Sequence, residues 1–165
     1  MGAVCVKDGI VVGTGVHRGA GTAHAEVEAL ATAGAGAHEA DLYVSLEPCS
    51  HFGRTPACTQ LIIDAGISRV FYAQDDPTSE AGGGAGVLRN AGLEVVGGFD
   101  SALSSALNRE WNHRMVTRMP FVTWKFAQSL DGRVAAAIGQ RTTISGTQSR
   151  SFVHELRARV GAVMV

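Results

Sequence analysis

Short β-rich runs alternate with helix-forming stretches from the N-terminus to about residue 100. Residues 3–6 and 10–16 flank Asp8-Gly9, a dipeptide typical of tight hairpin turns. The elements predicted after this hairpin are helix 25–33, strand 41–46, helix 56–65 with Thr55 as its N-cap, strand 69–73, a Gly-rich loop over 82–86, a helix ending at Ala91 and strand 93–96. Such alternation predicts an α/β sheet with helices on both faces.

A second segment is expected to begin near Pro120, after a helix and linker over residues 101–119. The predicted elements there are strand 121–126, an Asp131-Gly132 turn, strand 133–136, helix 149–159 and an apolar, strand-like run over 160–165. We therefore expect one domain over residues 1–118 and a fragment of another over 119–165.

Composition excludes several classes of protein. The 165 residues carry a net charge of −1, which argues against a general nucleic-acid surface, since such surfaces need clustered lysine and arginine. We find no basic leader followed by an apolar stretch, and no apolar run of the roughly 20 residues that a membrane span needs. Cys5, Cys49 and Cys58 are too few for a secreted disulfide framework. We expect a cytoplasmic protein without a membrane or nucleic-acid partner.

Four residues carry the strongest chemical signal: His24 and Glu26, then Cys49 and Cys58. One imidazole and two thiolates suit Zn²⁺, and three protein ligands leave a fourth position for water. Residues two apart do not share a helix face, so His24 and Glu26 can serve one site only at a helix start. Cys58 falls near the start of the next predicted helix, where the helix dipole favours a thiolate.

The His-x-Glu element with the following Pro48-Cys49 resembles the pattern of zinc-dependent nucleobase deaminases. That pattern has two residues between its cysteines, whereas eight separate them here. This longer loop, Ser50-His51-Phe52-Gly53-Arg54-Thr55-Pro56-Ala57, closely resembles that of the bifunctional riboflavin-biosynthesis deaminase/reductase family. Two further features match that family: Gly15 followed by His17, and the pair Asp76-Pro77.

The resemblance implies a three-layer α/β/α, cytidine-deaminase-like domain. It also implies Zn²⁺ held by His24, Cys49 and Cys58, with Glu26 as the catalytic proton shuttle. The implied substrate is a diaminopyrimidinone that carries a ribosylamino 5′-phosphate and loses its C2 amino group by hydrolysis. Its expected contacts are His17, His51, Arg54, Thr55 and Asp76, and the fork of donors on Arg54 suits a phosphate.

Residues 123–127 and 129–132 resemble the opening of the same family's NADPH-dependent reductase, a dihydrofolate-reductase-like α/β domain. The resemblance implies NADPH contacts at Ala127 and Thr143. It implies reductase-substrate contacts at Lys125, Arg141 and Arg157. Because Thr143 replaces the family's usual Trp and a Gly-rich cofactor loop is missing, we expect NADPH to serve only a full-length reductase domain. This chain is predicted to be inactive as a reductase.

The chain departs from the family at both ends, and we expect it to be truncated there. Relatives carry a helix before the first strand, and its absence is predicted to leave apolar sheet area exposed. Such a face favours association, and relatives form homo-oligomers. Thr78 stands where relatives carry Asn after Asp76-Pro77.

Two other interpretations stay open. The chain could be a cytidine- or tRNA-adenosine-type deaminase, although the long intercysteine loop and the reductase-like tail argue against both. It could instead be a catalytically silent, zinc-stabilised binding or assembly module.

Overall fold

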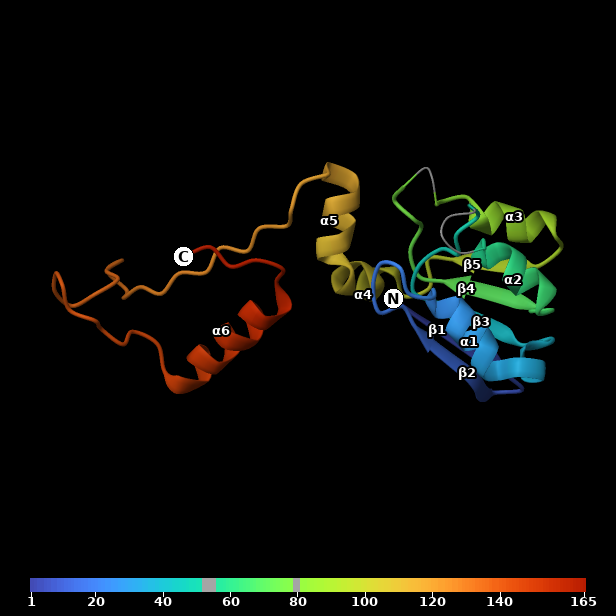
Figure 1. Ribbon diagram of the computed structural model, residues 1–165, viewed down its shortest axis with the longest axis horizontal. Coiled ribbons are helices and arrows are strands. Elements are labelled where there is room, and N and C mark those ends of the chain that lie inside the picture. The colour runs from blue at the N-terminus through green and yellow to red at the C-terminus, as the bar shows by residue number, and fades with distance from the viewer. Residues whose placement is uncertain (52–55, 79–80) are drawn as a thin grey trace. The chain divides into compact units, whose positions relative to one another are not determined.

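The computed structural model describes residues 1–51, 56–78 and 81–165, and the chain forms two compact units. The first unit is Met1–Phe121 and the second is Val122–Val165. Both units are drawn in Figure 1.

The first unit is built on a five-stranded mixed sheet with the strand order β2-β1-β3-β4-β5 (Figure 1). β1 is antiparallel to both β2 and β3, whereas β3, β4 and β5 are parallel. The strand bounds are β1 Gly2–Lys7, β2 Ile10–Val16, β3 Asp41–Val44, β4 Arg69–Tyr72 and β5 Glu94–Gly97. The α/β class predicted from the alternation of elements is confirmed.

Helices α1, α2 and α3 lie along one face of this sheet (Figure 1). They span Ala25–Ala33, Cys58–Asp64 and Gly84–Asn90, and a short 3-10 turn, η1, follows α1 at Gly34–Ala37. The core lies between these helices and the strands, and its largest fully buried side chains include Leu42, Ile62, Leu88 and Val70. Burial of such apolar side chains is the main stabilising contribution to the unit.

Two glycines of β2 let α1 approach the sheet unusually closely. A Cβ atom on Gly15 would lie 2.0 Å from the carbonyl oxygen of Ala25, and one on Gly13 would lie 2.3 Å from that of Ala29. Only glycine leaves room for these contacts, because neither position can hold a side chain. The start of α1, where His24 and Glu26 stand, therefore lies directly on the hairpin.

The opposite face of the sheet carries a row of aromatic and branched side chains. The rings of Tyr43 and Phe71 are stacked with centroids 4.7 Å apart, and Phe99 meets Tyr43 edge-on at 5.8 Å. Phe99 is 55% exposed, and Val11 is 57% exposed. The exposed apolar area expected from the sequence is present on this face.

Three helix boundaries differ from the prediction. α2 begins at Cys58 instead of Pro56, because Ala57 has an extended backbone and serves as the N-cap; the predicted cap, Thr55, lies outside the described residues. α3 begins at Gly84, inside the predicted loop, because Gly83 adopts a left-handed conformation that starts the helix. The helix predicted after residue 100 is two helices, α4 (Ser101–Leu107) and α5 (Arg109–Thr117), which are separated at Asn108.

The second unit contains one helix, α6, at Thr147–Arg159, which confirms the helix predicted there. The turn around Asp131-Gly132 also forms, with Gly132 at a φ of +80°. The predictions of strands over 121–126, 133–136 and 160–165 were wrong: within the described residues 121–165 no strand forms. A β-rich run needs a paired strand for its backbone groups, and Trp124 is 84% exposed instead.

No helix in the part of the chain that the structure describes combines the length and the apolar character needed to cross a membrane.

Candidate metal centre

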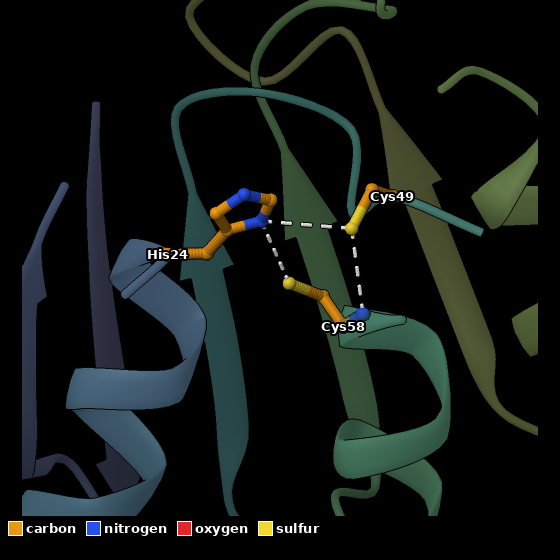
Figure 2. Close-up of side chains that lie close together, drawn as sticks. All are labelled: His24, Cys49 and Cys58. Carbon is orange, nitrogen blue, oxygen red and sulfur yellow. Dashed lines mark hydrogen bonds between the residues drawn. The ribbon is translucent and has the colours of Figure 1, made fainter. Parts of the chain in front are cut away.

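His24, Cys49 and Cys58 come together from three separate segments (Figure 2). His24 is the N-cap of α1, Cys58 is the first residue of α2, and Cys49 lies in the segment that follows β3. The Nδ1 atom of His24 lies 3.2 Å from the Sγ atom of Cys58 and 3.5 Å from that of Cys49. One ligand atom from each residue falls within 4.8 Å of the others.

These distances suit a tetrahedral zinc site. Nitrogen and sulfur ligands bound to zinc at about 2.0–2.3 Å lie about 3.5 Å apart in a tetrahedron. The two nitrogen–sulfur separations match this value, and the donor set of one imidazole and two thiols is borderline-soft, as zinc prefers. The group therefore fits zinc by both spacing and donor chemistry.

Hydrogen bonds between the two cysteines shift their pKa values in opposite directions. The pKa of Cys49 is lowered to about 5, mainly by a hydrogen bond from the Cys58 thiol and further by the Cys58 N–H, whose nitrogen lies 3.4 Å from Cys49 Sγ. The pKa of Cys58 is raised, because its proton is held by Cys49 and its thiol is buried. Without metal the pair thus retains one proton at neutral pH.

Glu26 is buried next to this group, in the first turn of α1. Its side chain is 9% exposed, and burial is the main cause of its raised pKa. The neighbouring His24 and a hydrogen bond with Cys58 act in the opposite direction and favour the carboxylate. A carboxyl group in such surroundings is suited to accept and return a proton.

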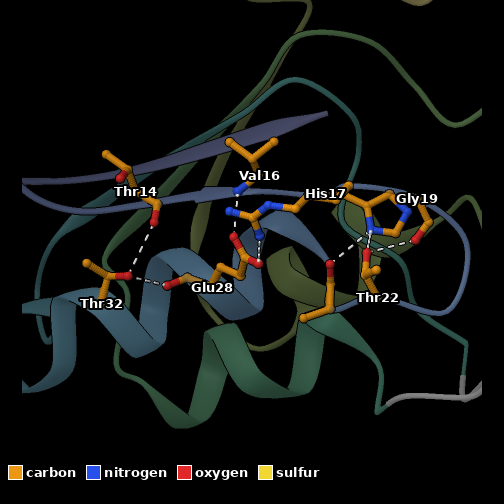
Figure 3. A network of polar contacts seen from close by, with 9 residues as sticks. Thr14, Val16, His17, Gly19, Thr22, Glu28 and Thr32 are labelled. Carbon is orange, nitrogen blue, oxygen red and sulfur yellow. Dashed lines mark hydrogen bonds and ion pairs between the residues drawn. The ribbon is translucent and has the colours of Figure 1, made fainter.

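His17 lies beside the cluster at the end of the hairpin. Its ring meets that of His24 edge-on, with centroids 5.3 Å apart, and its Nδ1 atom lies 2.9 Å from the carbonyl oxygen of Ala23. Figure 3 shows the polar network around it, in which Thr22 Oγ1 donates a hydrogen bond to the Gly19 carbonyl and Glu28 accepts one from the Val16 N–H. The structure therefore brings His17 to the metal group.

Asp76 forms a turn of its own. Its Oδ1 atom accepts hydrogen bonds from the N–H of Thr78 at 2.8 Å and from the Thr78 hydroxyl at 2.6 Å. One carboxylate oxygen is therefore engaged within the turn. His51 is exposed, and the other expected substrate contacts, Arg54 and Thr55, lie outside the described residues.

The expected reductase residues are only partly brought together in the second unit. Lys125 and Ala127 line a cavity of about 530 Å³ together with residues from the start of α6. Arg141, Thr143 and Arg157 are not among the residues that line it, although all of residues 122–165 are described.

Sequence reasoning gave no role to Glu47, which is 7% exposed directly before Pro48-Cys49. Its carboxylate accepts hydrogen bonds from the N–H groups of Asp76, Gly83 and Ala85. The only available signal was a carboxylate next to the Pro-Cys element, because the donors are backbone groups that stand 29 to 38 residues further along the chain.

Two family profiles match the chain. Residues 1–74 match the family described as the cytidine and deoxycytidylate deaminase zinc-binding region. The matched residues include His24, Glu26 and both cysteines of the group. Residues 120–165 match the family described as the RibD C-terminal domain.

Curated relatives align with the whole chain. It is 46% identical to the riboflavin biosynthesis protein RibD of Aquifex aeolicus over 166 residues, which covers 100% of the chain and 47% of that protein. It is 44% identical to RibD of Escherichia coli, covering 99% of the chain and 45% of the relative. The chain spans about half the length of the curated relatives it matches.

Solved structures agree with these matches. RibD of Acinetobacter baumannii superposes with a TM-score of 0.88 at 44% identity, covering 98% of this chain and 45% of that one. A deaminase/reductase from Thermotoga maritima gives 0.88 at 38% identity, with coverages of 94% and 45%. A structure from a study of tRNA:A34 deaminases gives 0.53 at 30% identity, covering 64% of this chain and 83% of that one.

Proposed function

Because the chain belongs to the RibD family of riboflavin biosynthesis proteins, we propose that residues 1–118 form a zinc-dependent pyrimidine deaminase. The proposed substrate is 2,5-diamino-6-ribosylamino-4(3H)-pyrimidinone 5′-phosphate, which would lose its C2 amino group by hydrolysis. The observation that carries the proposal is the convergence of His24, Cys49 and Cys58 beside the buried carboxyl group of Glu26.

His24, Cys49 and Cys58 would hold the zinc, and they leave one coordination position open. Bound zinc lowers the pKa of a water molecule towards about 7 and so supplies a nucleophile at neutral pH. Glu26 would accept a proton from the attacking water and pass it to the ring nitrogen. It would then carry the proton of the new C2 hydroxyl group to the amino group, which leaves as ammonia. Its burial supports this role, because burial raises the pKa of the carboxyl group and so makes it a better proton acceptor.

We propose that His17, His51, Arg54, Thr55 and Asp76 bind the substrate. The edge-on contact of His17 with His24 supports its place next to the reacting ring. The Asp76 turn is tied to the same region through Glu47. Single alanine variants at these five positions should each bind the substrate more weakly than the wild type, which binding measurements check.

In the second unit, Ala127 and Thr143 are proposed NADPH contacts of a complete reductase domain. Lys125, Arg141 and Arg157 are the proposed contacts of its substrate. We propose that residues 122–165 by themselves transfer no hydride, because the described residues of this unit form one helix and no sheet. Oxidation of NADPH by the purified chain, followed at 340 nm, would contradict this.

We further propose a cytoplasmic, homo-oligomeric protein. Three free cysteines, two of them in the metal group, support a reducing compartment. The exposed side chains of Val11 and Phe99, on the sheet face opposite α1–α3, support self-association, because exposed apolar area favours burial in an interface. Size-exclusion chromatography with light scattering tests the association.

Ammonia release by the purified, zinc-loaded chain tests the proposed activity. We expect about one zinc per chain and ammonia from the phosphorylated diaminopyrimidinone, but none from cytidine or from a tRNA with a wobble adenosine. Release from either comparison substrate alone would assign the chain to another class of deaminase. A chain that holds zinc and deaminates none of the three would be a silent zinc-stabilised module.

A further inference from the structure

The segment Glu47–Ser50, here called the ligand segment, is held from both sides by neighbouring elements. On one side, the N–H of Thr59 in α2 donates to the carbonyl oxygen of Cys49 at 3.2 Å. On the other side, the Ser50 hydroxyl donates to the carbonyl oxygen of Gly82 at 3.2 Å. These contacts with α2 and with Gly82 therefore help to fix the position of Cys49.

Within this segment, Glu47 is hydrogen-bonded to several other parts of the fold. Its Oε1 atom accepts hydrogen bonds from the N–H groups of Gly83 at 3.1 Å and Ala85 at 2.9 Å, at the start of α3. Its Oε2 atom accepts one from the N–H of Asp76 at 3.3 Å. Its own N–H donates to the carbonyl oxygen of Gln74 at 2.9 Å, two residues after the end of β4. One buried residue thus joins the segment after β4, the Asp76–Thr78 turn and the start of α3.

The two oxygens of Glu47 serve different partners. Oε1 accepts from two N–H groups at the start of α3, which also packs on the ligand segment. Among the described residues, Oε2 accepts only from the Asp76 N–H. Hydrogen bonds between backbone amides and a charged acceptor are stronger than neutral ones, so this carboxylate is an effective anchor for the turn. A buried carboxylate is stable in this place because the amides replace its water.

We propose that Glu47 is a positioning residue that fixes the Asp76–Thr78 turn against the metal ligands and so sets the affinity for the pyrimidine substrate. The proposal rests on the proposed deaminase function. It assigns Glu47 to substrate binding through Asp76, and it assigns no part of metal retention or proton transfer to Glu47.

Glu47→Gln separates the two contacts. The side-chain oxygen of Gln can still accept hydrogen bonds from the two N–H groups of α3. Its NH₂ group then faces the Asp76 N–H, and no hydrogen bond forms there because both groups are donors. In the zinc-loaded chain we expect the Asp76 amide to exchange with solvent at least about tenfold faster, with Gly83 and Ala85 within about threefold of the wild type. Glu47→Ala should accelerate all three amides. Glu94→Gln, which removes one exposed carboxylate from β5, is the control and should change none.

The same variants are then compared as enzymes. For Glu47→Gln we expect unchanged zinc content, a kcat within about twofold, and a KM for the phosphorylated diaminopyrimidinone raised about tenfold. Wild-type exchange at Asp76, an unchanged KM or loss of zinc from Glu47→Gln would each overturn the proposal. A wild type that holds zinc but releases no ammonia would refute the proposed function instead, and the exchange data would still decide whether Glu47 fixes the turn.

Discussion

The Nδ1 atom of His24 lies 3.2 Å from the Sγ atom of Cys58, although 34 residues separate the two in sequence. The contact joins the N-cap of α1 to the first residue of α2. Two helices that lie on the same face of the sheet thus begin at one point. Their starts, together with the ligand segment, form the candidate zinc site.

Removal of one ligand should abolish zinc binding. Cys58→Ala leaves only His24 and Cys49 in the group, too few for a stable site with an open position. We expect zinc content below about a tenth of the wild-type value and loss of the thermal stabilisation that zinc gives. Metal analysis and melting with and without a chelator check this. Cys5→Ala, in a buried cysteine outside the group, is the control and should keep its zinc.

Glu26→Gln should separate chemistry from metal binding. The amide fills the same buried space but cannot carry a proton between water and the pyrimidine. We expect zinc to be retained and kcat to fall about 10²–10⁴-fold, the usual contribution of a general acid–base group. Steady-state kinetics and metal analysis on one preparation test both points. Loss of zinc from this variant would show that Glu26 has a structural role instead.

The metal-free cysteine pair should titrate in two widely separated steps. The pKa of Cys49 is lowered to about 5 and that of Cys58 is raised, so at pH 7 one thiolate and one thiol are present. Because a lowered pKa stabilises the folded state above the unfolded thiol's pKa, this contribution of Cys49 is lost as the pH falls through about 5. Absorbance at 240 nm of the chelated chain should show one thiolate forming near that pH.

The same pKa shifts predict how many protons the cysteine pair releases when zinc binds. At pH 7 zinc should displace about one proton from the pair. Calorimetry in buffers of different ionisation enthalpy measures this number. Release of two protons at pH 7 would contradict the lowered pKa of Cys49.

Gly84→Ala should destabilise the first unit. A Cβ atom there would lie 1.8 Å from the carbonyl oxygen of Pro48, so α3 or the ligand segment must shift. We expect a loss of about 1–3 kcal/mol in the free energy of unfolding. Gly86→Ala is the matched control in the same helix, because its Cβ atom meets nothing within 4 Å. It should stabilise the unit by roughly 0.5–1 kcal/mol, and denaturant unfolding compares the two variants.

The features that sequence alone predicted are local ones. The hairpin turn at Asp8-Gly9 forms with both residues at positive φ, as this dipeptide favours. α1 begins and ends where its Ala-rich run predicted, and its start gives His24 and Glu26 the placement inferred from their spacing. Such features depend on a few neighbouring residues, which the sequence displays directly.

The features that sequence could not predict depend on distant partners. Nothing in the residues before Pro48 indicates that Glu47 binds amides at Asp76, Gly83 and Ala85. The start of α2 at Cys58 depends on the backbone of Ala57, which no propensity specifies. In the second unit, the apolar run around Trp124 has the composition of a strand, but a strand exists only where a second one pairs with it.

The close approach of α1 to β2 limits which substitutions the candidate metal centre can accept. Gly13 and Gly15 supply no ligand, yet a methyl group at either would push away the helix whose start carries His24 and Glu26. Substitutions in the hairpin, which contributes no residue to the metal group, can therefore disturb that group. A survey of functional variants should find these two positions nearly as invariant as the ligands themselves.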